Sequence, residues 1–135
     1  MSIFNLFKKE KMDNKKEKLN IEKTNVLDGI AFDEKNSKLI LFLSDGMDWT
    51  NEYNHLILLQ EKINHYIAYI ESKQYLKYLQ EHSIILDNVK QIEIELHFLF
   101  KETENCKKFL NNVEQIISSS LENTIITIES GTKEA

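Results

Sequence analysis

Lys-Gln-Ile-Glu-Ile-Glu-Leu-His-Phe-Leu-Phe, residues 90–100, is the stretch that decides the fold. Its apolar residues alternate with polar ones in a period of two, which is the pattern of a β-strand with one face in the core and the other in water. On this pattern Glu93, Glu95 and His97 share the wet face, which is therefore acidic. The sequence predicts a half-buried strand here.

Three further strands are expected on either side of this one. Residues 26–32 and the almost wholly apolar residues 38–43 flank the polar stretch 33–37, an arrangement typical of an antiparallel hairpin. Alternation returns at residues 123–129, which we expect to form the last strand.

Two long helices are predicted between the strands. The first extends from residue 51 to 71 or 72 and is capped by Thr50, and the second follows Thr103. Residues 75–79 could form a short additional helix at a new angle. Apolar residues recur three or four positions apart along both long helices, as expected for buried stripes. These are Leu56, Leu59, Ile63, Tyr66, Ile67 and Ile70 in the first helix, and Cys106, Phe109, Leu110, Val113, Ile116 and Ile117 in the second.

The fold class that follows is α+β, a single domain with the element order β-β-α-(α)-β-α-β. The simplest arrangement is a four-stranded, mainly antiparallel sheet with the two long helices packed on one face.

Charge divides the chain near Thr24. Residues 1–24 contain seven lysines and four acidic residues, whereas residues 25–135 contain ten lysines and eighteen acidic residues. We therefore expect a basic leader, flexible or forming a short amphipathic helix, attached to an acidic α+β domain. The leader carries an apolar patch that could make weak contact with a membrane surface. The patch consists of Ile3, Phe4, Leu6 and Phe7.

Composition excludes several classes of function. All 17 basic residues are lysines and the net charge is −5, so the chain lacks the guanidinium groups that read DNA bases, and nucleic-acid binding is not expected. Neither a signal peptide nor a transmembrane segment is visible, which favours a cytoplasmic location. Cys106 is the only cysteine, so an intramolecular disulfide and a thiolate metal cluster are both ruled out. We predict no cofactor and no metal site.

Asp45, Asp48, Trp49 and His55 gather around the start of the first long helix. In the structural interpretation the two carboxylates accept hydrogen bonds from loop amides, the tryptophan anchors the helix against the sheet, and the imidazole bonds to nearby backbone. The alternative is that the carboxylates and the imidazole bind a metal ion or a small ligand.

Gln60, Asn64 and Glu71 lie within 40° of one another when the helix is projected at about 100° per residue. They form a polar stripe that either holds a partner or borders the core.

The segment 45–72 resembles a known family. Asp45-Gly-Met-Asp-Trp49 precedes His55-Leu-Ile-Leu-Leu-Gln-Glu-Lys-Ile-Asn64, and Ile70-Glu-Ser72 closes the helix. This pattern resembles the bacterial domain-of-unknown-function family 6572. The resemblance implies a hairpin, a long helix, a strand, a helix and a last strand, and it implies no known activity. In that family a glycine usually follows Ile-Glu-Ser, where this chain has Lys73, and a proline-containing loop is replaced by residues 75–86.

Function is expected to lie in protein binding rather than in catalysis. The acidic domain favours a non-enzymatic protein that presents Glu93 and Glu95 to a basic partner, as a toxin-neutralising, immunity-type protein would. The alternative is a regulatory domain that binds a small ligand or metal through Asp45, Asp48 and His55.

Overall fold

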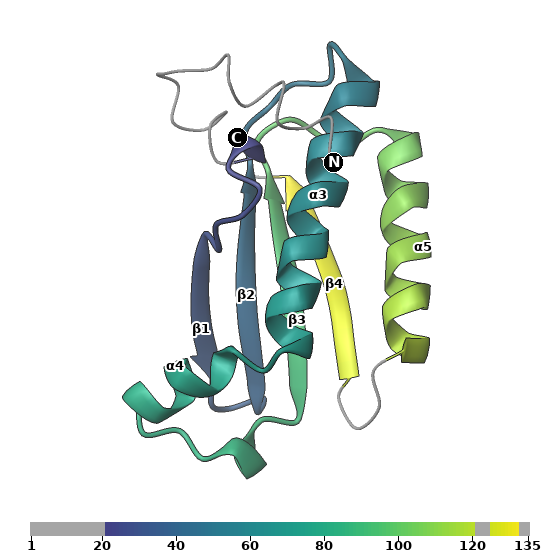
Figure 1. Ribbon diagram of the computed structural model, residues 1–135. Helices are drawn as coiled ribbons and strands as arrows, with labels where there is room; N and C mark the ends of the chain where they lie inside the picture. The colour runs from purple at the N-terminus through teal and green to yellow at the C-terminus, as the bar shows by residue number, and fades with distance from the viewer. Residues whose placement is uncertain (1–20, 121–124, 133–135) are drawn as a thin grey trace.

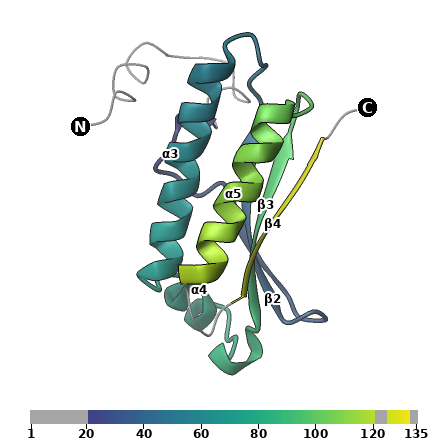
Figure 2. The ribbon, with the colours of Figure 1, turned by 90° about the vertical axis from the view of Figure 1, so that its right-hand side faces the viewer.

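The computed structural model describes residues 21–120 and 125–132 of the chain. Within them the helices and strands follow one another as β1 (Gly29–Asp33), β2 (Lys38–Asp45), α3 (Glu52–Glu71), α4 (Tyr75–Glu81), the 3₁₀ helix η1 (Leu86–Asn88), β3 (Gln91–Phe98), α5 (Glu104–Ser120) and β4 (Ile125–Thr132). Figure 1 and Figure 2 show α3 and α5 side by side on one face of the sheet, with α4 at the lower end. The α+β class is therefore confirmed.

The sheet is mixed, with the strand order β1-β2-β3-β4. Only the β1–β2 hairpin is antiparallel, whereas β2 and β4 both run parallel to β3, so the prediction of a mainly antiparallel sheet is wrong. The physical reason lies in the connections: a long helix that packs against the sheet returns the chain to the end where the previous strand began. β2–α3–β3 and β3–α5–β4 are two such crossovers.

The strands differ from their predicted limits at several ends. β2 is two residues longer than predicted and ends at Asp45, while β1 begins three residues late, at Gly29. Just before β1, the Tyr66 hydroxyl accepts a hydrogen bond from Asp28 N and donates one to Phe42 O, so the Asp28 amide bonds to a side chain. β4 begins at Ile125, and the two preceding residues of the predicted strand lie outside the described part.

Side-chain oxygens cap both long helices. Asn51, and not Thr50, caps α3: its Oδ1 accepts from Asn54 N at 3.2 Å. Thr103 caps α5 as predicted, because its Oγ1 accepts from Cys106 N at 3.1 Å. The predicted stripe of α5 is wrong at Ile116, which is 66% exposed.

The predicted short helix is confirmed as α4, and two tight turns hold it in place. At the end of α3, Lys73 N donates to Ile70 O and Gln74 N to Tyr69 O, the bond pair of a Schellman motif. Lys73 occupies the left-handed position of that turn with φ 59°, and Ser83 does the same after α4 with φ 57°. Glycine is the residue best suited to both positions.

The core lies between the sheet and the two long helices. Leu39, Leu41 and Leu43 face inward beside Ile92 and Ile94 of β3. The apolar side chains buried with them are Ile21, Leu58, Leu59, Ile63, Tyr66, Ile70, Tyr75, Leu79, Leu96, Phe98, Cys106, Leu110 and Ile117.

The predicted leader overlaps the folded domain, because Ile21 and Thr24 are both buried. The rest of the leader up to residue 20, including its apolar patch, lies outside the described residues. Among the residues that are described, no helix is both long enough and apolar enough to cross a bilayer.

Candidate functional site

Asp45 and His55 meet where β2 leads into α3. Alternation along β2 places Asp45 on the same face as its buried leucines, at the carboxyl end of the strand. His55 lies in the first turn of α3, on the buried side of the helix. Both side chains have 0% exposure, and Nε2 of His55 lies 2.6 Å from Oδ2 of Asp45.

The hydrogen bonds of this pair are complete. His55 Nδ1 lies 3.0 Å from Asp48 O, and Asp45 Oδ1 accepts from Met47 N at 3.1 Å. Both ring nitrogens face oxygen acceptors, so a hydrogen-bonded arrangement needs one proton on Nδ1 and a second between Nε2 and Oδ2. The pair therefore holds its loop together with charge-assisted bonds.

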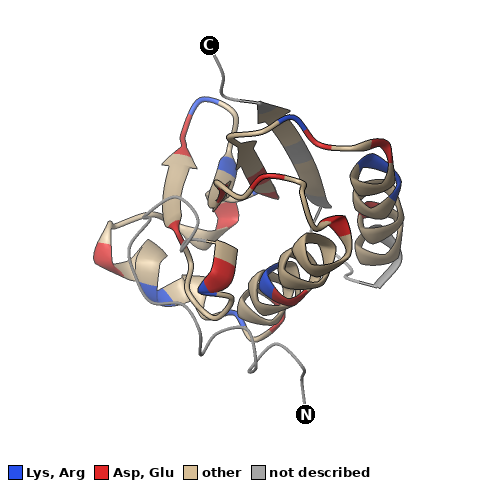
Figure 3. Cartoon of the chain, turned by 90° about the horizontal axis from the view of Figure 1, so that it is seen from above, with Lys and Arg blue, Asp and Glu red and all other residues tan. Residues whose placement is uncertain are grey.

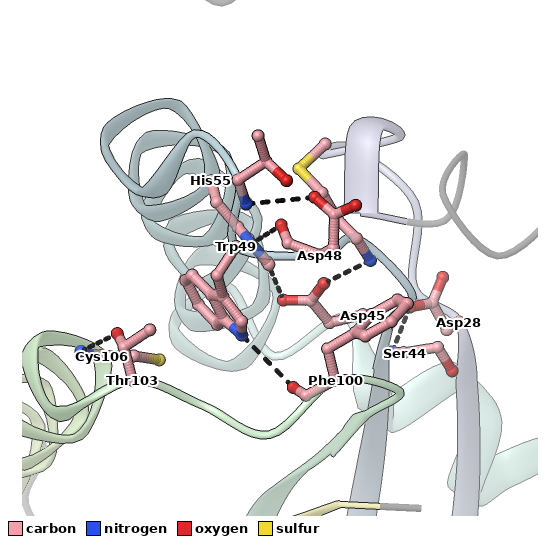
Figure 4. Close-up of polar contacts among 11 residues, drawn as sticks. Asp28, Ser44, Asp45, Asp48, Trp49, His55, Phe100, Thr103 and Cys106 are labelled. Carbon is pink, nitrogen blue, oxygen red and sulfur yellow. Dashed lines mark hydrogen bonds and ion pairs between the residues drawn. The ribbon is translucent and has the colours of Figure 1, made fainter. Parts of the chain in front are cut away.

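Trp49 covers the pair from outside. Its indole stacks on the His55 ring with the centroids 3.6 Å apart, and its Nε1 donates to Phe100 O at 3.3 Å (Figure 4). Asp48 Oδ1 accepts from Thr50 N at 3.1 Å. These contacts agree with the structural interpretation of the cluster: the carboxylates accept hydrogen bonds from loop amides, the imidazole lies against the backbone, and Trp49 stacks on the imidazole.

A second buried ion pair was not found from the sequence. Lys62 in the middle of α3 is fully buried, and its Nζ lies 2.9 Å from the carboxylate of Asp28, whose Oδ2 also accepts from Ser44 N at 2.8 Å. Burial lowers the pKa of Lys62, while the hydrogen bond that Lys62 donates to the Asp28 carboxylate opposes that shift. The same surroundings raise the pKa of Tyr66, chiefly by burial. The spacing from Leu58 and Leu59 to Lys62 is three and four residues, which was the available signal.

The acidic sheet face was predicted incorrectly at Glu93. This side chain is buried and its Oε1 pairs with Lys38 Nζ at 2.9 Å, because β3 is an inner strand and neighbours on both sides cover it. Glu95 is partly exposed, and its Oε2 lies 3.7 Å from Nε2 of His97. The face is therefore charge-compensated at its centre.

The polar stripe of α3 is solvent-facing. Gln60, Asn64 and Glu71 are all exposed, and they lie on the outer side of the helix, away from the Asp45–His55 pair. The nine predicted binding residues thus fall in three separate places: the loop between β2 and α3, the outer side of α3, and the far face of the sheet.

A different surface combines charge with exposed apolar groups. It lies at the carboxyl ends of β2 and β3, seen face-on in Figure 3, where the loops after the two strands meet. The Leu99 N–H donates to Asp45 O at 2.9 Å, and Asn105 Nδ2 donates to Glu52 Oε1 at 3.2 Å, so the loops are joined directly. We name this surface the carboxyl-edge patch; it comprises Asp48, Trp49, Glu52, Leu99, Phe100, Glu102 and Glu104.

Neutral partners hold two of the carboxylates of the patch. Glu52 bonds to the side chains of Thr103 and Asn105, and these bonds lower its pKa. Glu102 Oε2 accepts from Ser130 Oγ at 3.1 Å. Hydrogen bonds from neutral donors fix a carboxylate without cancelling its charge. Glu104 differs, because its Oε2 lies 3.3 Å from Lys107 Nζ.

The described residues were compared with the side-chain arrangement that a metal site requires. Among residues 21–120 and 125–132, no group of three or more His, Cys, Asp or Glu side chains is placed to hold an ion. Cys106 is fully buried, and burial raises the pKa of its thiol to about 12. Its place in the core agrees with the sequence prediction.

The comparisons with known proteins point to one family. Searches among curated proteins and solved structures gave no match. The profile of a family of unknown function, DUF6572, matches residues 19–130, which is most of the chain and includes the hairpin, both crossovers and the patch. The resemblance seen in the segment 45–72 thus extends through the whole fold, and the chain belongs to the DUF6572 family.

Proposed function

We propose that this chain is a non-enzymatic protein-binding domain that presents the carboxyl-edge patch to a basic partner. The observation that carries the proposal is the combination of exposed apolar side chains with several carboxylates on one surface. Leu99 is 41% exposed and Phe100 is 43% exposed. Interfaces commonly place apolar or aromatic groups at the centre and charged groups at the rim.

The electrostatics of the patch favour a positively charged partner. Its loops and helix starts contribute four carboxylates, those of Asp48, Glu52, Glu102 and Glu104, against two exposed lysines, Lys101 and Lys107, the second of which pairs with Glu104. Such a surface accelerates encounter with a basic protein and rejects acidic ones. A toxin with a basic surface is one partner of this kind, and a toxin-neutralising, immunity-type role is the specific form that we propose.

The patch is also pre-organised. The loop after β2 is held by the Asp45–His55 pair, and the loop after β3 by the bond from Trp49 Nε1 to Phe100 O. A surface that is already ordered loses little conformational entropy when a partner binds. The buried Asp45–His55 pair therefore stabilises the loops of the binding surface and does not contact the partner.

The experiment is an affinity purification from the native organism with three baits. They are the full chain, a Glu102→Lys/Glu104→Lys variant, and a Glu61→Lys/Glu71→Lys control that makes the same charge change on α3. We expect the full chain and the control to retain the same basic protein, and the patch variant to lose it. Retention should fall as salt is raised, because exposed charges are screened.

Two results would contradict the proposal. One is a partner that the patch variant retains as well as the control does. The other is a partner held equally at low and high salt, which would remove the electrostatic argument. Reconstitution with the purified partner, followed by Phe100→Ala, then tests the apolar centre: we expect a loss of affinity of about tenfold, as for an ordinary interface anchor.

A further inference from the structure

β1 is an edge strand that lacks the usual protection. It is the first strand in the sheet order and pairs with β2 alone, and among the described residues nothing bonds to its outer edge. Its sequence, Gly-Ile-Ala-Phe-Asp, contains no lysine and no proline, and its one charge, Asp33, is at the end. Sheet edges of this kind accept another strand readily unless charge, proline or a bulge prevents it.

A groove of about 530 Å³ adjoins this strand at Ile30. The cross-strand partner of Ile30 is the buried Leu41, so the groove lies on the helix-covered side of the sheet. In Figure 1, α4 follows the end of α3 and lies near the lower end of β1, and residues of these three elements line the groove. Its other walls are formed by Tyr69, Lys73, Lys77, Tyr78 and Glu81.

The turn between α3 and α4 and the anchoring of α4 in the core fix the position of the groove walls. The left-handed turn at Lys73 directs α4 away from the axis of α3. Tyr75 and Leu79 anchor α4 in the core, so that Lys77 and Tyr78 are left to face the groove. A stacking contact with His82, whose ring centroid is 4.1 Å away, steadies Tyr78.

The charge of the groove favours a bound segment that carries a carboxylate. Lys77 Nζ is 3.9 Å from Glu81 Oε2, whereas the ammonium of Lys73 has no ion pair among residues 21–120 and 125–132. The groove is thus locally positive in a chain of net charge −5. Tyrosine rings beside a lysine suit an apolar side chain followed by a carboxylate.

We propose that β1 and this groove, together the β1 groove, bind an extended segment of a partner protein by strand addition. The segment pairs its backbone with the outer edge of β1, places an apolar side chain against Tyr69 and Tyr78, and directs a carboxylate to Lys73. The site goes beyond the proposed function, because the groove lies at the end of α3 opposite the carboxyl-edge patch and takes the opposite charge.

The test begins with a random dodecapeptide library displayed on phage and selected against the full chain. We expect enriched peptides to share an apolar residue close to an acidic one. A selected peptide, added to ¹⁵N-labelled protein, should shift and protect the backbone amides of β1 and shift those of α4. N-methylation at successive peptide positions should abolish binding at every second position, because strand pairing uses alternate amides.

Variants separate the groove from other surfaces. Lys73→Glu/Lys77→Glu should weaken the selected peptide by about tenfold, because it removes the lysine that receives the carboxylate and reverses the charge beside it. Lys107→Glu/Lys108→Glu, the same charge change on α5, should leave affinity within about twofold, as expected for remote surface charges. Circular dichroism confirms that each variant folds.

The proposal is overturned if selection enriches nothing above the bare support, if the amide shifts fall on the carboxyl-edge patch, or if N-methylation shows no period of two. The Glu102→Lys/Glu104→Lys variant should bind the peptide like the unmodified chain. Its failure to retain a basic partner would then concern the carboxyl-edge patch alone, so the two proposals stand or fall separately.

Discussion

Replacing Lys62 by methionine is expected to destabilise the protein by about 3 kcal/mol, since removal of one member of a buried pair leaves an uncompensated charge. The ammonium has 0% exposure and lies 2.9 Å from the Asp28 carboxylate, whose side chain is 10% exposed. Methionine retains most of the lysine stem, so the loss is electrostatic and little cavity is created. We place the cost at the low end of the range because Ser44 N continues to bond Asp28.

The second variant is Asp28→Asn/Lys62→Met, which removes both charges and keeps an acceptor for Ser44 N. It should recover about 2 kcal/mol of the loss, because exchanging a whole buried pair for neutral groups is often close to neutral. The control is Lys77→Met on α4, whose side chain is 81% exposed and whose pair with Glu81 should contribute less than about 0.5 kcal/mol.

Urea unfolding followed by far-UV circular dichroism measures all four proteins, with free energies obtained by linear extrapolation. Two outcomes would refute the reasoning. In one, Lys62→Met costs no more than Lys77→Met, so the buried ammonium contributes nothing. In the other, the double variant is as unstable as the single one, which would mean that Lys62 acts through packing and not through the charge of Asp28.

Four further changes are open to the same measurement. His55→Ala should cost about 3 kcal/mol by leaving the Asp45 carboxylate buried without its partner, whereas Asp48→Ala should cost about 1 kcal/mol for one loop bond; equal costs would contradict the burial argument. Ser83→Gly should stabilise by about 1 kcal/mol, because its φ of 57° strains any residue with a Cβ; no gain in the denaturation midpoint would count against this. Native Cys106 should resist a thiol reagent until the chain unfolds. Because its folded pKa of about 12 is above the ordinary value of 9.0, the stability that the neutral thiol contributes is present below pH 9 and is lost as the pH rises toward 12. The difference in unfolding free energy between the unmodified chain and Cys106→Ala should therefore change between pH 9 and about pH 12.

The strand pattern was readable from the sequence, but the strand direction was not. Alternation at residues 91–98 predicted which side chains of β3 face the core, and burial of Ile92 and Ile94 agrees. A period of two is the same whether a neighbour runs parallel or antiparallel, so the pattern could not show the direction of β2 or β4. The two long helices determine the strand direction, because each helical crossover returns the chain to the end of the sheet at which the previous strand began.

The burial of charged side chains was the second feature that the sequence pattern could not predict. Glu93 follows the polar half of the alternation, yet its inner position in the sheet and its pair with Lys38 remove it from water. Lys62 is charged, and its own polarity would place it in water, yet it is buried beside Leu58 and Leu59 in α3. Sequence patterns score each side chain by its own polarity, and a pair formed between distant elements is invisible to them. Asp45 and His55 were recognised as a cluster because they lie only ten residues apart.

The crossover between β2 and β3 has a consequence for how the chain reaches this structure. Lys38 pairs with Gln91, 53 positions later, so the β1–β2 hairpin can form long before its inner neighbour exists. While the protein is being synthesised, the hairpin emerges from the ribosome with Leu39, Leu41 and Leu43 open to other chains. Contacts so far apart in sequence form slowly. Nascent chains should therefore rely on α3, which follows directly, to shelter those leucines until β3 arrives.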